Sequence, residues 1–474
     1  MRQNGLQPFE HFRAPAGDGA EVADAIVLPD TGFDGIAASA LDLLSSYAIL
    51  LVAAFLVTLL ATPIVRRIAI RFDVIDHPDE KRKVHRVPIA YLGGVSVFAG
   101  LLVAIVLSYI FTDSVTSQYA SVPLAVVVGM VAITFTGLAD DIWGFDPRLK
   151  IAGQLVAAAA LAIEDVGVRV AEGFLAPIMG LPEEAMFSDT FLPMLLNEHL
   201  YYWVGTALIA IFVLGSCNAT NLIDGLDGLL SGVVGIVAIG LLAICLLSPD
   251  PLLMVGEVDP NNLYGARIVL CIALLGAVLG FLPHNMNPAT IFLGDCGSLL
   301  LGYMCAVIIL MLGNEGKTHL VFAGLIVFSV PIMDTALAIL RRLLAGTSLS
   351  AADDQHLHHQ IKRALGGVKR AVFSIYGISA IFAMLGVSLA ALVTKTDLRV
   401  RVIYAIALML FSSIGVIAVK AARRTQYELA SKKIASRAVA RRKAAASPPP
   451  PPPPPSSDAP EADDATVAPS GSGR

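Results

Sequence analysis

The sequence predicts an all-α polytopic membrane protein. Of its 474 residues, 56% are hydrophobic and 15% are charged, whereas soluble domains are about 45–50% apolar and about 25% charged. About eleven apolar runs approach the roughly 20 residues that a helix needs to cross a bilayer. They are centred near Phe55, Gly100, Val128, Ala158, Leu208, Ala238, Leu274, Met304, Val327, Leu385 and Leu408. The net charge of -5 gives no global field that would favour nucleic acid as a partner.

The two ends of the chain are expected to lie outside the membrane domain. Residues 1–45 are acidic and Gly-rich and lack a basic segment directly followed by an apolar one, so they are predicted to be a disordered tail rather than a signal peptide. Residues 421–474 are first basic and then Pro-rich, which predicts a second disordered tail. The membrane domain is therefore expected to span residues 46–420.

Basic residues predict which side of the membrane each loop faces. Lys and Arg residues are frequent between Arg66 and Arg86, just after the first apolar run, and absent from residues 112–121. The positive-inside rule therefore places the first loop in the cytoplasm, the N-terminus outside and the C-terminus inside. With alternating spans, the loops around Asp140, Asn218 and Asn287 also face the cytoplasm.

One of these spans is weak, because Ile151–Ile163 is short for a crossing. We keep it because, without it, the acidic loops near residues 140 and 218 would face opposite sides. The following residues, 164–199, are then extracytoplasmic. The alternation in Val166–Val170 predicts a short β-hairpin there.

A polar island, Asn218–Gly228, lies between two apolar runs. It contains Asn221, Asp224 and Asp227, separated by apolar residues and glycine. An unpaired carboxylate at a membrane helix end costs several kcal/mol unless something there needs it. Oxygen ligands without a matching set of lysines favour a hard metal ion, Mg²⁺ rather than Zn²⁺. The alternative is an ordinary polar helix end with glycine caps.

A second acidic motif is the pair Asp140 and Asp141, at the end of the third apolar run. Two carboxylates about 4 Å apart repel by roughly 4 kcal/mol at an effective dielectric constant of 20, so a cation or a shared proton is expected between them. One carboxylate could coordinate Mg²⁺ while the other takes a proton from a nucleophile. A solvated loop pair is the alternative.

A third motif surrounds Asp295, which opens an apolar run. Gly294 and Gly297 flank it and leave the backbone open to a ligand. Phe292 could stack on a planar base, or it could be an interfacial aromatic residue.

Two motifs are basic. The first loop carries Lys83 and His85 and suits a phosphate, although ordinary positive-inside residues are the alternative. A later loop has three histidines in four residues, at positions 356, 358 and 359. They could bind zinc, but no cysteine or acidic residue completes a tetrahedral set convincingly, and nearby arginines favour a diphosphate.

Together these motifs resemble those of the polyprenyl-phosphate N-acetylhexosamine-1-phosphate transferases, the glycosyltransferase family 4 superfamily that includes WecA, TagO and MraY. The resemblance covers roughly residues 45–420, with the motifs in the same order. Such enzymes transfer a sugar 1-phosphate from a UDP-sugar to a membrane polyprenyl phosphate such as undecaprenyl phosphate, and they release UMP. The resemblance implies Mg²⁺ as cofactor, with Mn²⁺ as a substitute. It also implies a bacterial inner-membrane enzyme with a cytoplasmic active site that performs the first membrane step of cell-envelope polysaccharide synthesis.

The resemblance further assigns roles by position. It implies that Asp140, Asp141 and Asp295 are catalytic and that Asn221 and Asp295 hold Mg²⁺. The substrate-binding positions that it implies are Lys83, His85, Lys150, Asp224, Asp227, Phe292, His356, His358 and His359. Leu357 interrupts the histidines as in the WecA and TagO branch, so UDP-GlcNAc is the expected donor. The muramoyl-pentapeptide nucleotide of the MraY branch, which has three histidines in a row, is the alternative.

Two other classes of membrane protein share some of these features. A transporter would place polar groups near span centres and repeat its halves, whereas the acids here cluster at span ends. A zinc-dependent membrane hydrolase that uses the histidines is the other alternative. The sequence leaves open a homodimer, and it leaves open direct attack or a phospho-Asp intermediate.

Overall fold

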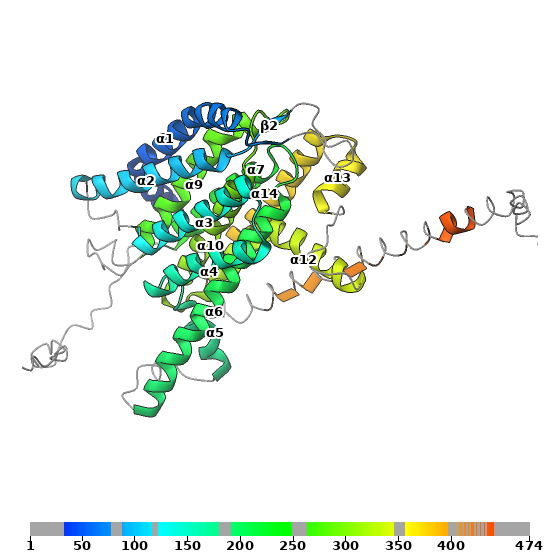
Figure 1. Cartoon of the computed structure of the whole chain (residues 1–474). Helices are drawn as coiled ribbons and strands as arrows, with labels where there is room; N and C mark the ends of the chain where they lie inside the picture. Colours follow the sequence, from blue (N-terminus) through cyan, green and yellow to red (C-terminus); the bar gives the residue numbers. More distant parts are fainter. Residues whose placement is uncertain are drawn as a thin grey trace, which may run out of the picture.

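The computed structural model describes residues 33–76, 88–115, 122–179, 191–248, 263–345 and 356–396, with scattered helical positions between 405 and 439. This part of the chain forms a bundle of long helices (Figure 1). In chain order the elements are α1 (Phe33–Arg71), β1 (Ile75–Asp76), β2 (Ile89–Ala90), α2 (Gly93–Val115), α3 (Leu124–Trp143), α4 (Pro147–Ile163), α5 (Val170–Met179), α6 (Phe191–Ile223), α7 (Leu229–Leu247), α9 (Tyr264–Asn285), α10 (Gly294–Leu312), η2 (Asn314–Gly316), α11 (Thr318–Val327), α12 (Ser329–Ala345), α13 (Leu357–Leu365) and α14 (Val368–Lys395).

The predicted polytopic helical membrane protein is confirmed. Among the described residues, eight helices are long and apolar enough to cross a membrane, and α11 with α12, bent by 76°, would make a ninth span. The weak run at 151–163 becomes α4, which has 17 residues and is not one of the eight. Around Leu408 only isolated positions are described. The predicted tails lie largely outside the described residues, although α1 begins at Phe33.

Helix α10 lies at the centre of the bundle and carries Asp295 in its first turn. It packs against α2, α3, α6, α7 and α9, so nearly every residue along it is buried. Glycines allow the neighbouring helices to approach its N-terminus. A Cβ on Gly137 of α3 would lie 2.5 Å from the Cα of Cys296, and a Cβ on Gly94 of α2 would overlap Gly297. The crossing of three helices therefore fixes Asp295.

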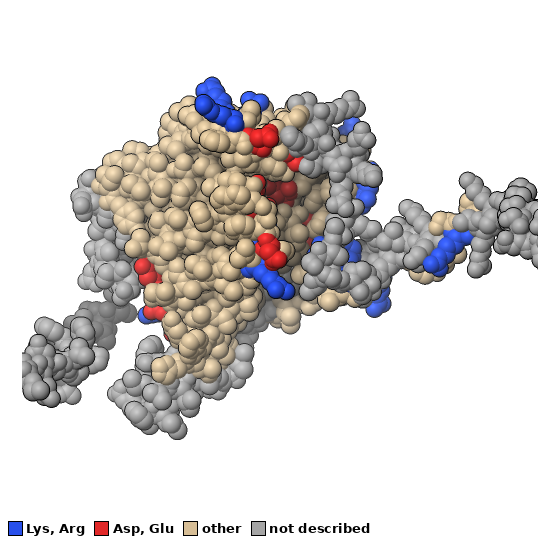
Figure 2. Space-filling model, in the orientation of Figure 1, with Lys and Arg blue, Asp and Glu red and all other residues tan. Residues whose placement is uncertain are grey.

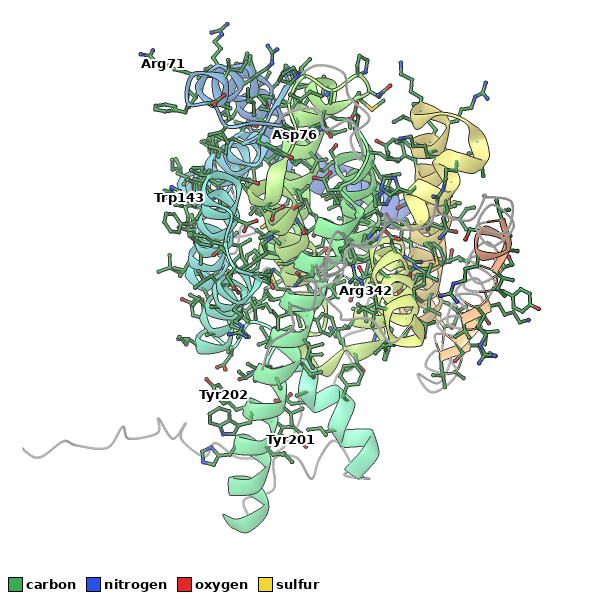
Figure 3. All side chains as sticks on the ribbon, turned by 45° about the vertical axis from the view of Figure 1, so that its right-hand side comes forward. Arg71, Asp76, Trp143, Tyr201, Tyr202 and Arg342 are labelled. Carbon is green, nitrogen blue, oxygen red and sulfur yellow. The ribbon has the colours of Figure 1, made fainter. Side chains whose placement is uncertain are left out.

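The two short strands form an antiparallel sheet in which Ile75 pairs with Ala90. The chain after β2 also binds the segment that precedes α10, because the Gly93 amide donates to the Phe292 carbonyl at 2.9 Å. This sheet lies at one end of the bundle, and α5 lies at the other (Figure 1). Figure 3 shows the same separation, with Asp76 at one end and Tyr201 and Tyr202 at the other.

The hairpin that we predicted at Val166–Val170 is wrong. The backbone there makes turns, with Gly167 at φ +91°, and then enters α5. Val166, Val168 and Val170 are all buried in the bundle core. An alternating pattern of valines therefore arose from packing of a turn rather than from a strand.

Candidate active site

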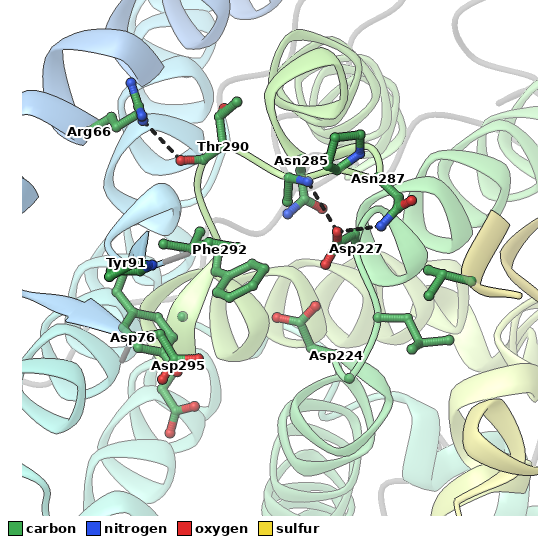
Figure 4. A pocket seen from close by; sticks show the side chains of 18 of the residues that line it. Arg66, Asp76, Tyr91, Asp224, Asp227, Asn285, Asn287, Thr290, Phe292 and Asp295 are labelled. Carbon is green, nitrogen blue, oxygen red and sulfur yellow. Dashed lines mark hydrogen bonds between the residues drawn. The ribbon is translucent and has the colours of Figure 1, made fainter. Parts of the chain in front are cut away.

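A cavity of about 730 Å³ lies at the end of the bundle that holds the sheet. It is lined by side chains from segments far apart in the sequence, including Asn221 in the last turn of α6, Asp224 just after α6 and Asp295 of α10. Figure 4 shows the Phe292 ring and the carboxyl groups of Asp224 and Asp227 around this space. Figure 2 shows acidic side chains inside a recess on one face of the molecule. The acidic loops near residues 140 and 218 thus share one side of the bundle, which the parity argument had assumed.

Asp141 caps the N-terminus of α10. Its Oδ1 accepts the Asp295 amide at 2.8 Å, and its Oδ2 accepts the Cys296 amide at 3.0 Å. A carboxylate is stabilised there by free N–H groups and by the helix dipole. Gly294 has φ +69°, and a Cβ on it would lie 2.5 Å from Asp141 Oδ2. This close approach requires glycine at position 294.

Asp140 has a different partner from Asp141, so the two adjacent carboxyl groups bind different parts of the protein. Its Oδ2 lies 2.9 Å from the Lys150 ammonium, and its Oδ1 accepts the Phe145 amide at 2.8 Å. The Lys150 ammonium also bonds to Asp295 Oδ2. One lysine at the start of α4 therefore joins the end of α3 to the start of α10. The sequence predicted a cation or a shared proton beside the acid pair. For Asp140, that cation is the Lys150 ammonium.

Asn221 approaches Asp295 from the other side. Its amide Nδ2 donates to Asp295 Oδ1 at 2.7 Å and to Ser298 Oγ at 3.0 Å. Asp295 is thus held by Lys150 through one oxygen and by Asn221 through the other. These contacts aim the carboxyl group at the cavity edge.

The polar island is fastened to the loop after α9. Asp227 Oδ2 accepts the Asn287 amide at 2.8 Å and the Ala289 backbone N–H at 3.0 Å. Asn285 Oδ1 accepts the Gly228 N–H at 3.1 Å, and the Tyr376 hydroxyl donates to the Gly228 carbonyl. Neither Asn285 nor Tyr376 was among the site residues predicted from the sequence. Both bind the backbone of Gly228, and Asn285 also accepts the Ser231 hydroxyl.

Among the described residues, the lining of the cavity is mainly acidic. Four acids line it, Asp76, Asp224, Asp227 and Asp295, whereas the basic lining residues in this part of the chain are Arg66 and His359. Burial, and then the negative charges of Asp295, Asp141 and Asp227, raise the pKa of Asp224 to about 8. Burial and the nearby positive charges of His358 and Lys362 lower the pKa of His359 to about 4, so this imidazole is neutral at pH 7.

This oxygen-rich, acidic set fits a hard divalent cation. A cation among the acids would relieve the repulsion that raises the pKa of Asp224, and it would let an anion enter the cavity. Within the described residues, no three His, Cys, Asp or Glu side chains are already gathered as a metal cluster. The described residues therefore show no closed metal site, and their acidic side chains are ones that a hard divalent cation could neutralise.

The histidine motif divides into two parts. His359 lines the cavity. His356 and His358 are buried, 8% and 2% exposed, and their Nδ1 atoms lie 3.3 and 3.4 Å from Oδ2 of Asp334 on α12. Sequence analysis missed Asp334, although an acid between the apolar residues of α12 was a visible signal. Lys83 and His85 lie outside the described residues.

Comparisons with known proteins identify similar membrane enzymes. The model of "Glycosyl transferase family 4" matches residues 123–313. The chain is 31% identical over 360 residues to the probable undecaprenyl-phosphate N-acetylglucosaminyl 1-phosphate transferase of Bacillus subtilis, over 75% of this chain and 87% of that protein. It is 34% identical over 336 residues to the decaprenyl-phosphate N-acetylglucosaminephosphotransferase of Mycobacterium leprae, over 68% of this chain and 78% of that protein. It is 29% identical over 345 residues to the undecaprenyl-phosphate alpha-N-acetylglucosaminyl 1-phosphate transferase of Escherichia coli, over 71% and 82%.

Proposed function

Because the chain belongs to glycosyl transferase family 4, we propose that it transfers N-acetylglucosamine 1-phosphate from UDP-GlcNAc to undecaprenyl phosphate and releases UMP. The relatives' names supply the reaction class. The observation that carries the proposal is the meeting of Asp224 and Asp295 in the lining of one membrane-end cavity, with Asp141 bonded to the backbone N–H of Asp295 although 154 residues separate the two.

In this reaction a phosphate oxygen of the lipid attacks the sugar-bearing phosphorus of the donor. The bond from that phosphorus to the oxygen of UMP breaks, and UMP leaves with the electron pair. Developing negative charge is shared by the attacking and leaving oxygens, so catalysis depends on positioning and on positive charge. The roles assigned below are those of direct attack. A phospho-Asp route would instead need an aspartate that attacks the phosphorus and later passes the sugar phosphate to the lipid, and UMP exchange into UDP-GlcNAc without lipid acceptor would distinguish the two.

Bound Mg²⁺ would neutralise the diphosphate and the leaving oxygen. We assign its protein ligands to Asp295 and Asn221, whose side chains are already in contact at the cavity edge. Lys150 holds Asp140 and Asp295 in place and supplies positive charge beside them. Asp141 is the proposed proton acceptor if the lipid phosphate enters protonated, and its bonds to α10 fix its position.

The nucleoside and the diphosphate are assigned to other lining residues of the same cavity. Phe292 offers a ring for the uracil, and the Tyr91 ring lies 6.0 Å away and supports it. Asp227, fixed by Asn287, is the proposed acceptor for nucleoside N–H or O–H groups. His359 is the proposed contact to the diphosphate.

We place the protein in the bacterial inner membrane, with this cavity facing the cytoplasm, where UDP-sugars are made. The basic first loop supports this orientation. Tyr202 and Trp203 lie at the opposite end, near the start of the α6 span, and suit the outer interface as aromatic anchors.

The test is a metal add-back assay. Purified protein in detergent is treated with a chelator and then given undecaprenyl phosphate, UDP-GlcNAc and either Mg²⁺ or Zn²⁺. We expect Mg²⁺ to restore UMP release, and we expect this release to require the lipid. Release that needs no lipid and returns only with Zn²⁺ would instead identify a zinc hydrolase.

A further inference from the structure

We infer that Asp334 is a positioning residue for the histidine motif, and through it for the diphosphate end of the cavity. The inference rests on the proposed function only for its kinetic test, which measures KM values for the proposed substrates. Asp334 belongs to α12 and has no exposed surface, and it does not line the cavity. Its three contacts all reach the start of α13.

These contacts use both carboxylate oxygens. Oδ1 accepts the backbone N–H of Leu357 at 2.7 Å. Oδ2 lies 3.3 Å from Nδ1 of His356 and 3.4 Å from Nδ1 of His358. A buried carboxylate is strongly unfavourable without partners. Here the Leu357 N–H makes a hydrogen bond to Oδ1, whereas the two imidazoles lie at ion-pair distance from Oδ2 and make no hydrogen bond to it. The start of α13 is therefore bound to α12 at this point.

The same geometry sets the orientation of His358. An N–H at Nδ1 faces the carboxylate, so Nε2 faces away from it. A Cβ on Gly225 would overlap His358 Nε2, which places that nitrogen against the polar island. Gly225 itself lines the cavity. His358 is thus a wedge between a buried acid and the loop that carries Asp224 and Asp227.

His359 is linked to this wedge by ring contact. The His358 and His359 ring centroids are 4.3 Å apart, and the His356 and His358 rings stack at 5.5 Å with planes 12° apart. A displacement of His358 therefore displaces His359, which lines the cavity. Asp334 acts on the substrate only through these rings.

The test replaces Asp334 with Asn, which keeps the size but turns one acceptor into a donor that faces N–H groups. We expect the KM for UDP-GlcNAc to rise by about tenfold or more, the range seen when a partner that orients a ligand is removed, with the KM for undecaprenyl phosphate unchanged. A merely smaller folded fraction would lower apparent kcat and leave both KM values unchanged. Thr335→Val, the next residue on α12, is the matched control and should keep wild-type kinetics.

A double-mutant cycle tests whether Asp334 acts through His358. Asp334→Asn combined with His358→Ala should be no worse than the poorer single variant, because both changes remove the same wedge. Asp334→Asn combined with Phe292→Ala should show multiplied effects. Multiplied losses in the first pair, or wild-type kinetics in Asp334→Asn, would overturn the inference.

Amide hydrogen exchange gives a readout that needs no substrate. Asp334→Asn should speed exchange in residues 356–365 but not in α14, whereas Thr335→Val should change neither. Unchanged exchange in residues 356–365 would overturn the positioning role. If wild-type protein transferred no sugar phosphate from any UDP-N-acetylhexosamine, the proposed function would fail, and the exchange result would still decide whether Asp334 holds the histidines.

Discussion

A methyl group added at Gly294 would disturb the geometry of the site as well as the stability of the backbone. A matched glycine elsewhere in the chain allows the two effects to be told apart. It opens α10 at φ +69°, and Asp141 Oδ2 would lie 2.5 Å from an added Cβ. Real Cβ atoms do not tolerate such a contact, so the Asp141 carboxylate in Gly294→Ala has to withdraw. It would then lose its bonds to the Asp295 and Cys296 amides, now 2.8 and 3.0 Å long.

Gly144 provides the matched control. It ends α3 at φ +67°, and nothing lies within 4 Å of an added Cβ. Alanine at either position costs about 1–2 kcal/mol of stability, because an L-residue disfavours the left-handed region. Only Gly294→Ala also displaces a carboxylate of the site. Loss of a positioned proton acceptor costs about 10²–10⁴ in rate, so Gly294→Ala should lose at least about 100-fold and Gly144→Ala should stay near wild type.

The assay measures UMP release at saturating UDP-GlcNAc, undecaprenyl phosphate and Mg²⁺, with thermal unfolding measured in the same detergent. We expect the two variants to have similar unfolding temperatures and very different rates. Wild-type rates in Gly294→Ala would refute the reasoning that the Asp141 contact matters. Equal rate losses in both variants would attribute the effect to backbone strain instead.

Three further predictions concern acids that line the cavity or lie beside it. Asp295→Asn should abolish transfer while the protein still inserts and folds, and near-wild-type activity at saturating Mg²⁺ would contradict its role as a metal ligand. Asp140→Asn and Asp141→Asn should each lower the rate by at least about two decades, measured as UMP release, and a loss of only a few-fold would argue against a role for the pair. Because the pKa of Asp224 is raised to about 8, its proton competes with a bound cation below that pH, so the apparent Mg²⁺ affinity should rise about tenfold from pH 6 to pH 7 and level off above about pH 8. Asp224→Asn should weaken the pH dependence of the apparent Mg²⁺ affinity, measured by a Mg²⁺ titration of activity or binding. An unchanged pH dependence would show that Asp224 takes no part in cation binding.

Much of the architecture could be predicted because each level of the sequence carried an independent signal. Apolar runs predicted the spanning helices. Ile151–Ile163 was kept as a crossing on the assumption that the acidic loops near residues 140 and 218 share a side, and these loops do meet at Asp295 through Lys150 and Asn221. The gathering of Asp141 and Asp295 followed from their common place at span ends. Their hydrogen bonds did not follow, because they depend on how closely α3 and α10 approach at Gly137 and Gly294.

Other features depended on packing that no local pattern reveals. Val166, Val168 and Val170 alternate like a strand, but all three fit into the bundle as a turn. His358 and His359 are adjacent in sequence, yet about 100° of helical rotation points one toward Asp334 and leaves the other at the cavity. Which histidine faces inward is decided by α12, which itself follows a 76° bend after α11.

The most direct test of the central claim compares donors. Purified protein is incubated with undecaprenyl phosphate, Mg²⁺ and, in separate reactions, UDP-GlcNAc, other UDP-N-acetylhexosamines and the muramoyl-pentapeptide nucleotide, and both UMP and the lipid product are measured. We predict equal amounts of UMP and lipid-linked GlcNAc 1-phosphate from UDP-GlcNAc and no product from the muramoyl nucleotide. Product from the muramoyl nucleotide with none from UDP-GlcNAc would contradict the account.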